Sequence, residues 1–135
     1  MTGVLLYNIR AEKLAKIKFI SIKLGLSAKE VSPADFSQPV GSLAGLTGFA
    51  PTGESGAEPF GEEMLVMCGL SSPQFSAFLN ALRQNRCTVA LKAVLTETNA
   101  AWDSLRLQRE LAAEHEALQQ VTPKDAEKKS AHRKK

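Results

Sequence analysis

A cluster of polar and aromatic residues lies near the end of the chain, within the stretch Lys92–Leu118. Thr96, Thr98 and Asn99 follow an apolar run, and Trp102, the only tryptophan, comes directly before an expected helix. Hydroxyl and amide groups can orient a polar ligand, and an indole ring can cover its apolar part. The same residue types also form Asx and ST turns, and a tryptophan also packs helices on sheets. The sequence leaves both interpretations open: a binding site, or a turn that joins a strand to a helix.

The helix expected after this cluster carries three residues with acid–base chemistry. Glu110 and Glu114 are four residues apart and share one face of a helix, and His115 follows directly. Carboxylates and an imidazole placed in this way can move protons beside a bound ligand. The alternative is a solvent-exposed helix face with a like-charged pair.

Asn8 and Cys68 are the remaining candidates for a binding site, because each comes at the end of an expected strand, as Thr96 does. In an open parallel sheet, ligands bind outside the carboxyl ends of the strands. In such a sheet Asn8 and Cys68 would line one crevice together with the polar cluster. In a ferredoxin-like sandwich the third and fourth strands run opposite to the first, and the shared crevice disappears.

The elements that must position these residues follow from apolar runs and helix start signals. Runs that are apolar on both strand faces indicate strands covered on both sides. They lie at 4–9, 64–70 and 88–96, with a weaker candidate at 28–32. Two Ser-Pro pairs predict helix starts, and an aspartate is expected to cap the last helix. The helices are expected at 11–24, from Ser32 to about Leu46, from Ser72 through Leu82, and from Ser104 to about Gln119.

This order of elements predicts a single small α/β domain of about four strands over residues 1–120. A strand–helix–strand pattern occurs twice, about 60 residues apart. An open parallel sheet is favoured, because some thirty residues with a helix start signal separate the second and third strands. The alternative is a ferredoxin-like α+β sandwich, in which those two strands form a hairpin.

Charge and composition divide the chain into three parts. Residues 1–120 hold eleven basic and twelve acidic residues, so the positive net charge of +3 comes from the basic tail at 121–135, which has six basic and two acidic residues. The tail is expected to be disordered, and its association with RNA would be weak, since it lacks aromatic side chains for stacking. The Gly- and Glu-rich segment 48–63 is expected to be a loop, and a loop of this length is often a functional lid or a disordered insertion.

Several kinds of site lack their sequence signature. The two cysteines are far apart without a C-x-x-C motif, which favours small buried side chains in a reducing cytoplasm. No Walker or dinucleotide motif is present, and no clustered Cys and His indicate a metal site. We therefore expect no cofactor and no metal. No apolar run indicates a signal peptide or a membrane span, so the expected location is the cytoplasm.

Three motifs resemble one small bacterial family. They are VLLYN near the start, EEMLVMCGL in the middle, and LKAVLT-x-TN-x-x-W followed by EL-x-x-EH near the end. Together they resemble the family catalogued as domain of unknown function 3783, over about Val4 to Leu118. This resemblance implies an uncharacterised cytoplasmic bacterial protein and brings no activity with it. The crowded KIKFISIK segment and the basic tail depart from the pattern.

The sequence favours a small binding or interaction module without a recognisable catalytic motif. Its partner would be a small ligand or a protein, and a homo-oligomer remains open. One alternative is an enzyme that acts on a small polar metabolite at the ends of the strands, with His115 as acid or base. The other alternative is weak association with RNA through the tail.

Overall fold

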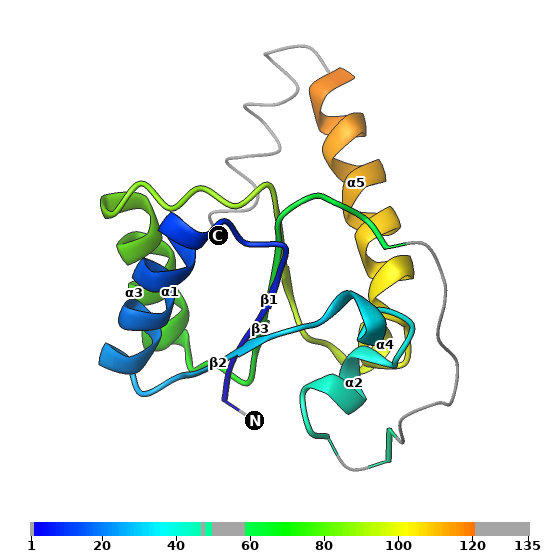
Figure 1. The fold of residues 1–135 in the computed structure, drawn as a ribbon, viewed down its shortest axis with the longest axis horizontal. Helices are drawn as coiled ribbons and strands as arrows, with labels where there is room; N and C mark the ends of the chain where they lie inside the picture. The colour runs from blue at the N-terminus through cyan, green and yellow to red at the C-terminus, as the bar shows by residue number, and fades with distance from the viewer. Residues whose placement is uncertain (1, 47, 50–58, 121–135) are drawn as a thin grey trace.

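The computed structural model describes residues 2–46, 48–49 and 59–120, with only the backbone of residues 115–120. The expected loop at 48–63 lies mostly outside the described residues, and the expected tail at 121–135 lies entirely outside them. The chain forms one small α/β domain around an open four-stranded sheet, as the sequence predicts (Figure 1). The strands are β1 (Gly3–Tyr7), β2 (Ser27–Glu30), β3 (Met64–Cys68) and β4 (Leu91–Val94).

The strand directions correct the parallel sheet that the sequence favours. β1 is parallel to β2 and β3 is parallel to β4, but β1 and β3 are antiparallel, with Tyr7 opposite Met64. The strand order β2-β1-β3-β4 also separates β2 from β3, so the ferredoxin-like hairpin does not fit either. The sequence favours a parallel sheet for a physical reason: a continuous apolar run indicates that both faces of a strand are covered, but it does not indicate in which direction the neighbouring strand runs.

Two helices lie side by side on one face of the sheet: α1 (Ala11–Lys23) and α3 (Ser72–Gln84) (Figure 1). Each helix joins two parallel strands, and such crossovers are right-handed in almost all proteins. One crossover leads from β1 to β2 and the other from β3 to β4, so they leave the centre of the sheet in opposite directions. Because β1 and β3 are also antiparallel, right-handed crossovers place both helices on the same face. The weak internal repeat of the sequence thus corresponds to two β-α-β units joined through β1 and β3.

The other face is covered by α2 (Val40–Leu43), α4 (Glu97–Ala100) and α5 (Ser104–Gln120) (Figure 1). Alternate residues of the central strands serve the two layers. In β1, for example, Val4 and Leu6 pack towards α1 and α3, whereas Leu5 and Tyr7 pack towards α5. All residues of β1 and β3 are buried, as the continuous apolar runs predict.

Helix starts follow the predicted signals, with one correction. Ser71 and Gln74 form a capping box at α3, and Asp103 accepts a hydrogen bond from the Arg106 amide at 2.8 Å at the start of α5. The long helix expected from Ser32 is instead a single 3₁₀ turn, Pro33–Asp35, followed by the short α2. Pro39 explains the break, since proline lacks an amide donor and disfavours helical backbone in the residue before it.

A buried hydrogen bond joins the sheet to the α5 layer. The Tyr7 hydroxyl and the Ser104 Oγ lie 2.8 Å apart, and both residues have no exposed surface. Burial raises the pKa of the Tyr7 phenol well above its ordinary value, although the hydrogen bond to Ser104 lowers it in part, so the phenol stays protonated. The Tyr7 ring also packs against Phe36, with 5.4 Å between centroids. These contacts hold the start of α5 against the middle of the sheet.

The start of α1 is tied to β3 by a partly buried ion pair. Lys13 Nζ lies 2.7 Å from Glu63 Oε1 and also donates to the Thr88 carbonyl oxygen. The Arg10 amide donates to the other Glu63 carboxylate oxygen at 3.0 Å. Burial alone would raise the pKa of Glu63, but the hydrogen bonds and charges of Lys13 and Arg10 outweigh it and lower that pKa below its ordinary value.

In the part of the chain that the structure describes, no helix is both long and apolar enough to cross a membrane.

We expect Tyr7→Phe to lower the free energy of unfolding by about 1–2 kcal/mol, because it leaves the buried Ser104 hydroxyl without a partner. Ser104→Ala should have a similar effect, since it leaves the Tyr7 hydroxyl unpaired. Urea denaturation of both single variants and of the double variant measures the coupling. The double variant should lose less than the two single losses added together. Strictly additive losses would show that the two hydroxyls are not coupled.

Glu63 should make the protein less stable in acid. Its pKa is lower in the folded state, so it stabilises the fold above its unfolded pKa, and that contribution is lost as pH falls through the folded pKa. We expect Glu63→Gln to be less stable than the unchanged protein near pH 7, with the gap closing as the pH falls through the lowered pKa of Glu63. Urea denaturation at a series of pH values from neutral to acidic measures this difference in stability. Glu12→Gln, an exposed change on α1 next to Lys13, is the control and should follow the unchanged protein.

Candidate functional site

A hollow of about 340 Å³ lies beside β4 and the first half of α5, and we call it the β4–α5 hollow. Six of the residues singled out in the sequence line it: Thr96, Thr98, Asn99, Trp102, Glu110 and Glu114. The others are Lys92, Ala93, Val94, Leu107 and Leu111. The structure therefore brings together the polar cluster after β4 and the acidic pair on the helix that follows.

The Thr-x-Thr-Asn step is a helix cap. The Thr96 Oγ1 accepts from the Asn99 amide at 3.1 Å, and the Asn99 Oδ1 accepts from the Thr96 amide at 2.8 Å. Asn99 Nδ2 also donates to the Val94 carbonyl oxygen at 3.0 Å. The buried Asn99 amide thus has both its oxygen and its nitrogen engaged within the turn. Thr98 is exposed on the hollow.

Trp102 stands half-buried at the wall of the hollow and is held from two sides. The Arg106 guanidinium lies over its ring, 4.4 Å from the centroid, one turn further along the chain. The Trp102 carbonyl oxygen accepts a hydrogen bond from the Val40 amide at 2.8 Å, which links the segment before α5 to α2. The backbone of Trp102 is therefore part of the framework, while its ring contributes an apolar surface to the hollow.

Glu110 and Glu114 are exposed on the face of α5 that borders the hollow. Their spacing places both carboxylates on one side of the helix, as the sequence predicts. The His115 side chain lies outside the described residues, so its predicted acid–base role stays a prediction. Two carboxylates beside an indole ring form a surface that attracts a cationic or amphipathic group.

Asn8 lies at the opposite end of the sheet from the hollow. It follows the end of β1, whereas Cys68 and Thr96 come at the opposite end, because β3 and β4 run antiparallel to β1. Its Nδ2 donates to the carbonyl oxygens of Phe60 and Glu62, at 2.8 and 3.0 Å. The single crevice expected for Asn8, Cys68 and Thr96 is therefore wrong, and Asn8 instead anchors the chain that enters β3.

Cys68 is a core residue. It has no exposed surface and belongs to the apolar cluster between the sheet and α5. Burial raises the pKa of its thiol to about 11, so the reactive thiolate is disfavoured. Cys68 cannot act as a ligand contact or nucleophile at the hollow, which corrects its assignment to the site.

The sequence interpretation missed the residues of β4 that border the hollow. Lys92 and Val94 are exposed on the edge strand, Val94 to 47%. A signal was present, because a single lysine within an otherwise apolar strand is typical of a sheet edge. The edge position of β4 itself depends on long-range strand pairing and could not be recognised locally.

The groups at the hollow are partly engaged in the fold and partly exposed. The hydroxyl of Thr96 and the amide of Asn99 are engaged in the cap, and the wall adds aromatic, aliphatic and carboxylate groups and the ammonium group of Lys92. Among the described residues, no three His, Cys, Asp or Glu side chains come close enough to hold a metal ion. Glu110 and Glu114 are exposed on the α5 side of the hollow.

We expect Asn99→Ala to lower the free energy of unfolding by about 1–2 kcal/mol, because it removes the cap and the bond to Val94. Thr98→Ala is the matched control in the same turn. Its side chain is exposed, so a change within about 0.5 kcal/mol is expected. Thermal or urea denaturation measures both. Equal stability of the two variants would contradict the capping role of Asn99.

Comparison with known proteins places the hollow in a recognised family segment. Residues 63–118 hold β3, α3, β4, α4 and most of α5, and so include every residue that lines the β4–α5 hollow. Neither the curated proteins nor the solved structures contain a match to the chain. A family model does match residues 63–118, that of the family described as Domain of unknown function (DUF3783). This is the family that the motifs resemble, and the match includes the last motif and nearly all of the middle one, whereas VLLYN at residues 4–8 lies outside it.

Proposed function

We propose that the protein is a small non-catalytic binding or interaction module whose site is the β4–α5 hollow. The observation that carries this proposal is the convergence of Trp102, Glu110 and Glu114 on an open hollow beside an edge strand. An exposed part of an aromatic ring supplies contact area, and two carboxylates select for positive charge.

The state of the polar groups favours binding over catalysis. The buried Asn99 amide is engaged in the helix cap, and the Cys68 thiol is buried with a raised pKa. An enzymatic function would need groups that are free to change their protonation or to attack a substrate. The convergence of Asn8 and Cys68 with Thr96 and Asn99, on which the enzymatic alternative depended, does not occur.

The structure supports a peptide or protein partner rather than a deeply enclosed small ligand. The hollow is open along β4, and its walls combine apolar with acidic groups. Small-molecule sites usually enclose most of the ligand surface. A partner with a basic residue next to an apolar one matches the acidic pair and the Trp102 ring.

Photo-crosslinking tests the proposed site. A photoreactive amino acid is placed at Thr98 or Glu114, which are exposed on the hollow, and the protein is irradiated in the cells that produce it. We expect a discrete adduct at both positions. The matched control is Ser76, an exposed position on α3 in the other helix layer, which should give no such adduct.

A second comparison tests whether the adduct depends on the chemistry of the site. Adding Glu110→Lys to the Thr98 probe should reduce the yield of the adduct, because it reverses charge at the hollow. Adducts that form equally from Ser76, or that ignore Glu110→Lys, would overturn the proposal.

A further inference from the structure

The outer edge of β4 carries unpaired backbone groups that face away from the sheet. The amides of Leu91 and Leu95 donate to Glu63 and Met67, so these alternate residues face β3. In a parallel ladder, the residues between them direct their N–H and C=O groups to the opposite side. Lys92 and Val94 therefore present their backbone groups to the outer edge of the sheet, where β4 is the last strand.

One of these four groups is already occupied. Asn99 Nδ2 donates to the Val94 carbonyl oxygen, so the edge is capped at the end that leads into α4. Within the described residues, the ladder between β3 and β4 engages Leu91, Ala93 and Leu95, so it leaves the N–H and C=O of Lys92 and the N–H of Val94 on the outer side. These three groups are the ones that an added strand would meet.

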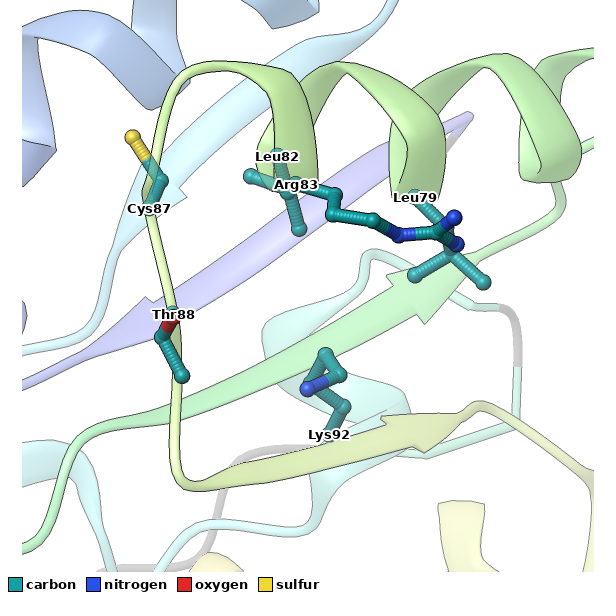
Figure 2. Close-up of a pocket in the computed structure, with 6 residues that line it drawn as sticks. All are labelled: Leu79, Leu82, Arg83, Cys87, Thr88 and Lys92. Atoms are coloured by element: carbon teal, nitrogen blue, oxygen red, sulfur yellow. The ribbon is translucent and has the colours of Figure 1, made fainter. Parts of the chain in front are cut away.

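The two sides of this edge differ in charge. On the α5 side lies the β4–α5 hollow with Glu110 and Glu114. On the α3 side a second hollow of about 280 Å³ is lined by Leu79, Arg83 and Lys92, among others. Figure 2 shows Lys92 rising from β4 below α3, the helix that carries Leu79 and Arg83. Lys92 lines both hollows, so they flank the same edge of the sheet.

We infer that the outer edge of β4 takes up an extended segment of a partner protein as an additional strand. Successive side chains of a strand point to opposite faces, so one set would enter the β4–α5 hollow and the other set the hollow below α3. Charge complementarity defines the segment. It carries basic or apolar side chains towards Glu110 and Glu114, and acidic or apolar side chains towards Arg83 and Lys92. This inference rests on the proposed function and names the partner class for the same site.

The same charges argue against a second copy of this chain as the occupant. If two β4 strands paired across a two-fold axis, Lys92 and Arg83 of both copies would share one face, and Glu110 and Glu114 of both copies the other. Like charges that face each other across strands destabilise such a pair. A partner segment whose charge alternates between its two faces would place opposite charges beside those of this chain on both sides of the edge.

The test uses a synthetic peptide of roughly ten residues, about the length of a long strand. Valine and threonine form its framework, with lysines on one face and glutamates on the other. Titration is followed by the fluorescence of Trp102, the only tryptophan, and by amide hydrogen exchange. We expect slower exchange at Lys92 and Val94 on binding, with no change at Leu91 and Leu95, which are bonded to β3 already.

Two control peptides isolate the strand geometry and the charge pattern. The same peptide with methylated backbone nitrogens cannot donate to an edge and should not bind. A peptide of equal composition, with its lysines and glutamates mixed on both faces, should bind about tenfold more weakly. The charge-reversed variant Glu110→Lys should also lose about tenfold, whereas Lys16→Glu, an exposed change on α1, should leave binding unchanged.

Val94→Pro tests the edge itself. It removes the outward N–H of Val94 without removing a bond to β3, and proline is tolerated on sheet edges. Val94→Ala keeps that N–H and is the control. We expect loss of binding for Val94→Pro only. If Val94→Pro does not fold, the exchange measurement on the unchanged protein decides.

The outcomes separate this inference from the proposed function. A change in Trp102 fluorescence without slower exchange at Lys92 and Val94 would overturn strand addition and leave the hollow as a binding site. Absence of peptide binding would also overturn strand addition, while crosslinking from Thr98 would still decide the proposed function. Slower exchange at both amides, lost on backbone methylation, supports the inference.

Discussion

The antiparallel pairing of β1 with β3 is the constraint on which the rest of the structure depends. It joins two right-handed β-α-β units head to tail at the centre of the sheet, with all ten residues of these two strands buried. Because the second unit is reversed, α1 and α3 fall on the same face. The opposite face must then be covered by the segments outside the two units, and these are the segments that form α2, α4 and α5. The position of the β4–α5 hollow follows from this division.

The α5 layer is held to the sheet by contacts between residues far apart in the chain. Tyr7 and Ser104, 97 positions apart, share a buried hydrogen bond, and the Gln108 side chain donates to Glu62 at 2.9 Å. The Trp102 carbonyl oxygen pairs with the Val40 amide. Together these bonds place α5 at a defined distance from β4. The walls of the hollow are therefore held in place by these long-range hydrogen bonds. Glu110 and Glu114 lie on a helix, α5, rather than on a loop.

Near-neutral charge over residues 1–120 conceals two layers of opposite sign. The α1 and α3 helices hold five basic residues and one acidic residue, whereas Glu97–Glu114 holds four acidic and two basic residues. The positive charge excess of the whole chain lies in the tail, as the sequence shows. The separation of basic and acidic residues into two layers cannot be seen in that count, because the two signs separate only when the layers form. β4 lies at the sheet edge between these layers, and this position gives the two sides of its edge their different chemistry.

Much of the local structure could be predicted from the sequence, since it depends on neighbouring residues. The apolar runs located β1, β3 and β4, and the weaker candidate at 28–32 located β2. The Ser72-Pro73 pair and Asp103 located the starts of α3 and α5, although the residue that caps α3 is Ser71. The polar cluster and the acidic pair line one hollow, because Thr96, Asn99, Trp102, Glu110 and Glu114 lie within twenty residues and meet across one turn. The capping role of Asn99 was one of the two interpretations that its residue type allowed.

Only the tertiary structure decided the strand directions, the sheet order and the identity of the edge strand. These features removed Asn8 and Cys68 from the site and added Lys92 and Val94 to it. The physical reason is that burial and helix capping leave a periodic or positional trace in the local sequence, whereas strand pairing depends on contacts between distant segments. A buried strand has the same apolar pattern whichever way its neighbour runs, so the sequence determined what is covered and the fold determined what remains open.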